Sequence, residues 1–107
     1  MWGFALFSQK GENMKYTYKI STYANSEIFA ELKKDIGEFY PGFPFEKEIK
    51  DADGSCTDFF RCAKTGETIA AELSYANNNI ILTGDVRMPE LAEKYKLAKA
   101  EPNEEET

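Results

Sequence analysis

Residues 51–83 read DADGSCTDFFRCAKTGETIAAELSYANNNIILT. Three pairs of turn-forming residues interrupt this stretch at nearly even spacing: Asp53-Gly54, Thr65-Gly66 and Asn77-Asn78. Between them, apolar and polar residues alternate, which is typical of strands with one buried face. Together with the alternating stretch that precedes Asp51, the pattern predicts an antiparallel meander of four strands.

The turns also predict the register of the meander. A two-residue loop at Asp53-Gly54 places Ala52 opposite Ser55. One face then carries Phe45, Lys47, Ile49 and Asp51 opposite Cys62, Phe60, Asp58 and Cys56. Loops of the same kind at the other two turns set Phe60 against Ala71 and Leu73 against Leu82. Phe60 should therefore be more buried than Phe59.

Strands and helices are also expected on both sides of the meander. Residues 14–22 alternate as a half-buried strand, and residues 2–8 would complete a hairpin with it, although Met14 could also be an alternative start. Asn25-Ser26 offers a helix N-cap, and apolar residues recur at helical spacing up to Phe39, before Pro41-Gly42 ends the helix. A second helix is predicted from Pro89 to about Ala100.

These elements indicate a single α+β domain over residues 1–100. We expect an antiparallel sheet of four to six strands, with the first helix packed on one face and a second helix at the C-terminus. Residues 101–107 read as a disordered acidic tail, because four of the seven are glutamates.

Composition narrows the function classes. The chain has 107 residues and a net charge of −6, without the clustered Lys and Arg that nucleic-acid binding needs. No apolar run approaches the ~20 residues of a membrane helix. The apolar start, residues 1–7, lacks the positively charged leader of a signal peptide, so we expect a cytoplasmic protein.

The chain contains no histidine, which removes the commonest general base and most zinc sites. Cys56 and Cys62 fall about 20 Å apart on one predicted strand and should remain unpaired thiols. Asp51–Ser55 briefly resembles a calcium loop, but Ile49 and Phe60 stand where ligands belong, so a hairpin turn explains it better. We therefore predict no cofactor, no metal and no catalytic residue.

Two sets of residues are candidates for function. Tyr40 and Phe43 lie in an aromatic and proline-rich turn outside the helical and strand periods, which suits a partner-binding surface unless they cap the core. Lys47 and Asp58 are charged members of the inward face, where they could pair or line a pocket between helix and sheet.

A third candidate is the strand around Ile81. If residues 79–83 form an open edge of the sheet, Ile81 points away from the core and could support a homodimer. Taken together, the sequence predicts a small non-catalytic protein-binding module, of the inhibitor, immunity or adaptor type. The alternative is a small-ligand or catalytic domain with a pocket near Asp58.

Overall fold

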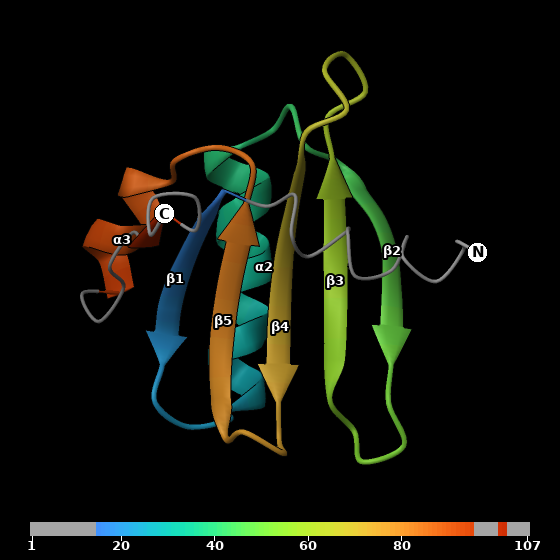
Figure 1. The fold of residues 1–107 in the computed structure, drawn as a ribbon, viewed down its shortest axis with the longest axis vertical. Helices are drawn as coiled ribbons and strands as arrows, with labels where there is room; N and C mark the ends of the chain where they lie inside the picture. The colour runs from blue at the N-terminus through green and yellow to red at the C-terminus, as the bar shows by residue number, and fades with distance from the viewer. Residues whose placement is uncertain (1–14, 96–100, 103–107) are drawn as a thin grey trace.

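The computed structural model describes residues 15–95 and 101–102. Within them, six strands and two helices follow in the order β1 (Tyr16–Ser21), α2 (Ser26–Phe39), β2 (Phe45–Lys50), β3 (Cys56–Arg61), β4 (Thr68–Ser74), β5 (Asn79–Gly84), α3 (Pro89–Tyr95) and β6 (Glu101–Pro102). The strands form one antiparallel sheet in the order β2-β3-β4-β5-β1-β6. Figure 1 labels each of them except β6. The predicted α+β class and the meander are confirmed.

Three predictions fall wholly or partly on residues that the structure does not describe. The strand expected at 2–8, the helical residues after Tyr95 and most of the stretch 101–107 lie outside the described residues. Two residues of that last stretch, Glu101–Pro102, form β6 and pair with the start of β1.

Helix α2 begins where the capping chemistry places it. The Asn25 side chain accepts hydrogen bonds from the backbone N–H groups of Glu27 and Ile28, each at 2.9 Å. This satisfies two N–H groups that the first turn of a helix leaves without partners. The helix ends at Phe39, just before Pro41.

The helix lies against one face of the sheet, over β4 and β5, and the main core fills the space between them (Figure 1). Fully buried side chains include Leu32, Ile36, Ile69, Ile80 and Leu82. The core also admits one tyrosine, Tyr18, whose hydroxyl accepts a hydrogen bond from the Met88 backbone N–H at 2.8 Å. Its polar group is thereby satisfied inside the core.

The helical and strand patterns place Phe39 and Phe45 on the faces that should be buried, but neither side chain lies in the core. Phe39 is 44% exposed and Phe45 is 56% exposed. Phe39 is the last residue of α2, and Phe45 lies on the outermost strand, where the helix no longer covers the sheet. Hydrophobic period alone does not indicate how far the covering layer extends.

The register of the first hairpin also differs from the prediction. Asp51 donates its backbone N–H to the Ser55 carbonyl at 2.8 Å, so the loop holds one more residue than a two-residue turn. Gly54 adopts a φ of +94°, as the last position of a three-residue hairpin loop requires. This one-residue slip exchanges the two faces of β2.

As a result, Glu48 and Lys50 lie opposite Asp58 and Cys56, on the helix side of the sheet. Lys47 and Ile49 lie on the other face, opposite Phe59 and Thr57. A bulge between Phe45 and Lys47 restores Phe45 to the helix side, opposite Phe60. The predicted pairing of Lys47 with Asp58 is therefore wrong, because the two side chains point to opposite faces.

The next two turns shift the register by two residues, which preserves the faces. Phe60 pairs with Ile69 instead of Ala71, and Leu73 pairs with Ile80 instead of Leu82. Phe60 belongs to the main core, at 6% exposure, while Phe59 is 8% exposed and packs with Ala70 on the opposite face. The expected order of burial holds, but both phenylalanines are buried.

The dimer edge predicted at Ile81 is wrong. Strand β5 lies between β4 and β1, so its backbone is paired on both sides. The meander does not end at β5, because β1 closes onto it from the N-terminal side. In the described parts of the chain, neither helix has the length and apolar character that a membrane crossing requires.

Candidate functional site

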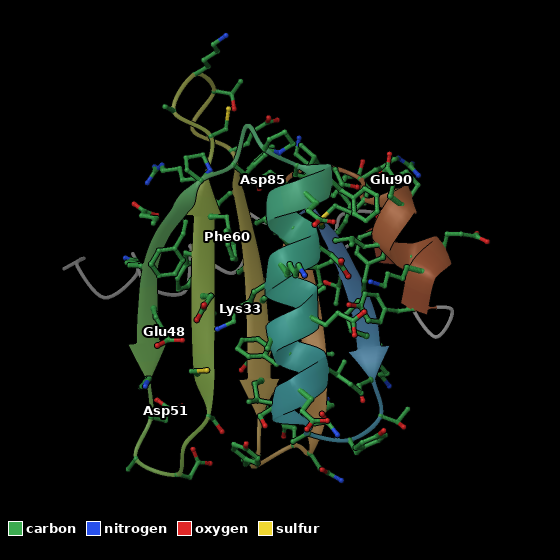
Figure 2. All side chains as sticks on the ribbon, turned by 180° about the vertical axis from the view of Figure 1, so that it is seen from behind. Lys33, Glu48, Asp51, Phe60, Asp85 and Glu90 are labelled. Carbon is green, nitrogen blue, oxygen red and sulfur yellow. The ribbon has the colours of Figure 1, made fainter. Side chains whose placement is uncertain are left out.

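One half of the sheet extends beyond the helix that covers the other half. Figure 2 shows α2 in front of the central strands, with β3 and then β2 emerging to one side of it. Every residue of β2 is exposed. On the helix side of β2 and β3, charged and polar side chains therefore lie at the margin of the main core.

Asp58 lies at the centre of this region. It is only 3% exposed, and its Oδ2 atom lies 3.3 Å from the Lys33 Nζ atom, which reaches across from α2 (Figure 2). The Lys33 ammonium also lies 4.8 Å from the centre of the Phe29 ring. Among the described residues, Asp58 Oδ1 has no hydrogen-bond partner. Asp58 is thus a buried carboxylate that is satisfied on one oxygen only.

The Glu48 carboxyl lies directly across the strand pair from Asp58. Burial raises the pKa of Asp58 to about 6, the adjacent Glu48 carboxyl adds to this rise, and Lys33 opposes it. The contact with Asp58 in turn lowers the pKa of Glu48. Of the two carboxyls, Asp58 therefore has the higher pKa and binds a proton more tightly than Glu48.

Cys56 completes the group. Its sulfur lies on the same face of β3 as Asp58, and the ligand atoms of Glu48, Cys56 and Asp58 are all within 4.8 Å of one another. Burial raises the pKa of the Cys56 thiol, and the two nearby carboxyls raise it further. Both cysteines are free, as expected. Because its pKa is raised, Cys56 is a poor nucleophile by itself.

Lys47, which the sequence placed beside Asp58, is separated from it by the sheet. Its ammonium lies 5.5 Å from the centre of the Phe59 ring on the opposite face. The sequence placed both Asp58 and Cys56 on this face, but it singled out only Asp58 as a candidate site residue. The sequence missed Glu48, because the predicted hairpin register placed it on the opposite face of the sheet. It missed Lys33, because the helical spacing places this residue beside the apolar face of α2 and not on it.

Tyr40 and Phe43 are half-buried and pack against the main core. The Tyr40 hydroxyl donates a hydrogen bond to Glu90 Oε1 at 2.5 Å, which ties the end of α2 to α3. Burial, with Glu90 adding to it, raises the pKa of Tyr40. This geometry is that of residues closing the end of the core.

A second buried carboxylate, Asp35, lies on the other flank of α2. Its Oδ2 atom accepts hydrogen bonds from Lys94 Nζ at 2.7 Å and from the Tyr95 hydroxyl at 2.8 Å. Lys94 also lies 2.8 Å from Glu31, so its charged contacts join the two helices. A shallow, charged depression lies beside this contact, lined by Ala30, Glu31, Lys34, Asp35, Glu38 and Lys94.

The outer edge of the sheet is the other unusual feature of this region. No described strand lies beyond β2, which pairs with β3 alone. Phe45 and Ile49 on this strand are among the most exposed large apolar residues described, at 56% and 49%. An edge strand with free backbone groups and exposed apolar side chains can accept a further strand.

Comparison with known proteins adds no functional assignment. No family model matches the chain, and neither the curated proteins nor the solved structures include a significant match.

Proposed function

We propose that this chain is a non-catalytic protein-binding module that binds by strand addition at the β2 edge, with a second copy of itself as the occupant. The observation that carries the proposal is the edge itself, a six-residue outer strand that is exposed along its whole length. Backbone groups on such an edge supply affinity, and side-chain pairs select the partner.

The faces of β2 define what a partner strand must present. Glu48 and Lys50 point to the helix side, where they lie within 3.8 Å of each other, and Ile49 points to the opposite face. Directly opposed residues of an antiparallel pair share a face and favour opposite charges or apolar contacts. A matching strand therefore places a basic residue opposite Glu48, an apolar residue opposite Ile49 and an acidic residue opposite Lys50.

The chain's own β2 meets this requirement in a single register. In a twofold-symmetric pair, the central residue lies opposite itself in the other copy. Centring on Ile49 pairs the two Ile49 side chains and sets each Glu48 against Lys50 of the second copy. It also brings Lys47 of one copy opposite Asp51 of the other. Centring on Lys47, Glu48 or Lys50 instead places like charges face to face.

Sedimentation velocity over a range of concentrations tests the proposal. Because the overlap is short, we expect a dimer with a Kd of about 0.1–1 mM. Ile49→Lys replaces the apolar contact with two opposed ammonium groups and should weaken the dimer at least about tenfold. The matched control is Tyr23→Lys, because Tyr23 is equally exposed, at 50%, but lies after β1.

Three outcomes would overturn this assignment of partner or edge. A chain that stays monomeric at about 1 mM excludes the second copy as occupant. A dimer that Tyr23→Lys weakens as much as Ile49→Lys excludes the edge. If a monomeric chain instead captures another protein that Ile49→Lys alone loses, the edge binds a different partner and the self-association is wrong.

A further inference from the structure

Three side chains with metal-binding atoms converge beneath the β2 edge. Glu48 comes from β2, Cys56 and Asp58 come from β3, and their ligand atoms lie within 4.8 Å of one another. Carboxylate oxygen and thiolate sulfur are both established ligands of zinc in proteins. Small side-chain rotations would bring three atoms at this separation to three corners of a tetrahedron around one ion.

The second observation is the free oxygen of Asp58. Its side chain is only 4% exposed, and Oδ1 has no hydrogen-bond partner among the described residues. A buried acceptor without a donor costs about 1–3 kcal/mol. Lys33 meets the other oxygen, Oδ2, so Oδ1 remains available to a ligand. A cation bound by all three residues would remove this cost.

We propose that Glu48, Cys56 and Asp58 form a binding site for a thiophilic divalent cation of the zinc class. The ion binds the Cys56 thiolate and one oxygen of each carboxylate, and the Cys56 proton passes to solvent. The fourth position lies on the exposed side, next to Glu48, and is open to water. This inference goes beyond the proposed binding function and does not depend on it.

The ligand set selects the kind of ion. Calcium takes six to eight oxygen ligands and magnesium needs an octahedron of oxygens, whereas this group offers three protein atoms including a sulfur. Soft thiolate ligands favour zinc and related ions, and two carboxylates are compatible with them. We therefore expect Zn²⁺ and Cd²⁺ to bind, and Ca²⁺ and Mg²⁺ not to compete.

Lys33 is the built-in competitor of the ion. Its ammonium lies 3.3 Å from Asp58 Oδ2 and supplies the positive charge that balances Asp58 in the metal-free chain. A bound dication repels it, and the Lys33 side chain, which is 33% exposed, can turn outward into water. Removing the Lys33 charge should therefore strengthen metal binding, although it breaks an ion pair of the metal-free protein.

Cysteine alkylation tests the site, because the chain carries its own internal control. Zn²⁺ should slow the reaction of Cys56 with iodoacetamide and leave Cys62, in the loop after β3, unchanged when both are followed by peptide mass spectrometry. Competition with a zinc chelator then gives the affinity. Asp58→Asn and Glu48→Gln should weaken binding at least about tenfold, Cys56→Ser should abolish it, and Cys62→Ser should not affect it.

The decisive variant is Lys33→Gln. We expect it to bind zinc more tightly than the wild type, whereas weaker binding would contradict the competition between Lys33 and the ion. Equal protection of the two cysteines, or none, would overturn the site itself. Circular dichroism of each variant checks the fold. The Ile49→Lys variant should retain full zinc binding, so failure of the dimer and failure of the metal site give different results.

Discussion

The two buried aspartates of this fold lie on opposite flanks of α2 and have opposite surroundings. Asp35 accepts hydrogen bonds from Lys94 and Tyr95, both on α3, so it fastens one helix to the other. Within the described part of the chain, Asp58 meets Lys33 as its one charged donor and keeps a buried oxygen without a hydrogen-bond partner. The Asp35 carboxylate is held by contacts between the two helices, whereas the Asp58 carboxylate keeps one oxygen that could accept a ligand.

The same contrast extends to the two halves of the sheet. The half formed by β4, β5 and β1 lies under α2 and α3 and contains most of the core. The half formed by β2 and β3 has a polar group on its helix side and an open outer edge. Most of the buried apolar side chains thus lie at one end of the sheet, and the group of Glu48, Cys56 and Asp58 lies at the other, so each half can be perturbed separately.

The largest expected effect comes from the covered half. Leu32→Ala removes a fully buried side chain from α2 and should lower the free energy of unfolding by about 2–5 kcal/mol. Phe45→Ala on β2 should cost less than about 1 kcal/mol, because more than half of that ring is already in water. Urea denaturation of both variants checks this difference, and similar losses would mean that the two halves are equally structural.

Substitution of the two aspartates should show the same contrast, with the larger loss of stability at Asp35. Asp35→Asn removes the charge that Lys94 and Tyr95 contact and should lower stability by about 1.5–3 kcal/mol. Asp58→Asn should change it by less than about 1 kcal/mol, because burial already favours the neutral form of Asp58 and an amide has nearly its shape. Urea unfolding with a chelator present measures both. A loss of several kcal/mol in Asp58→Asn would instead identify the Lys33 ion pair as essential to the fold.

A smaller effect should appear at alkaline pH. Burial, together with the hydrogen bond to Asp35, raises the pKa of Tyr95 above its ordinary value. The folded chain therefore keeps this proton more firmly than the unfolded chain, and the stability it contributes is present below about pH 10 and lost as the pH rises further. Tyr95→Phe should cost about 1 kcal/mol at pH 8 and less at pH 11.

Thermal unfolding of the wild type and Tyr95→Phe at the two pH values measures this difference. Tyr40 also has a raised pKa, so both proteins lose some stability when the pH is raised. A cost of Tyr95→Phe that does not shrink at pH 11 would show that the hydroxyl of Tyr95 does not link α3 to Asp35.

The smallest stability effect is expected at the edge. Ile49→Lys should leave the free energy of unfolding of the monomer within about 0.5 kcal/mol of the wild type, because the side chain contributes little to the core. Urea titration below the dimerisation range measures it. A loss above about 2 kcal/mol would mean that Ile49 belongs to the folded monomer and not to an interface.

Local patterns predicted most of the fold. The Asn25 cap, the alternation of β1 and the three turn pairs all led to elements that the structure contains. At the second and third turns the predicted strand register was wrong by two residues. The predicted faces remain correct, because a shift by an even number of residues leaves each side chain on the same face. The sequence also placed Asp58 on the helix side correctly.

The rest depends on facts that a pattern does not contain. One extra residue in the loop around Gly54 exchanges Lys47 for Glu48 beside Asp58. The glycine does not reveal this, because a two-residue turn also uses a glycine of positive φ. The contact of Lys33 with Asp58 joins distant elements, so it depends on how α2 lies over the sheet. The position of β5 inside the sheet followed from its pairing with β1, which no turn signal predicted.

We propose that charge pairs on β2 select a second copy in the register centred on Ile49. Mixing two charge variants tests this register most directly. In this register, position 48 of each copy faces position 50 of the other copy. Glu48→Lys alone therefore opposes two lysines at each of these contacts, and Lys50→Glu alone opposes two glutamates. Each variant should be monomeric, in the presence of a chelator, at concentrations where the wild type dimerises.

An equimolar mixture of the two variants restores opposite charges at both positions, so sedimentation velocity should show a heterodimer at least as stable as the wild-type dimer. Circular dichroism of each variant alone establishes that it is folded. A mixture that remains monomeric while the wild type dimerises would contradict the register and, with it, the assignment of β2 as the edge where a second copy binds.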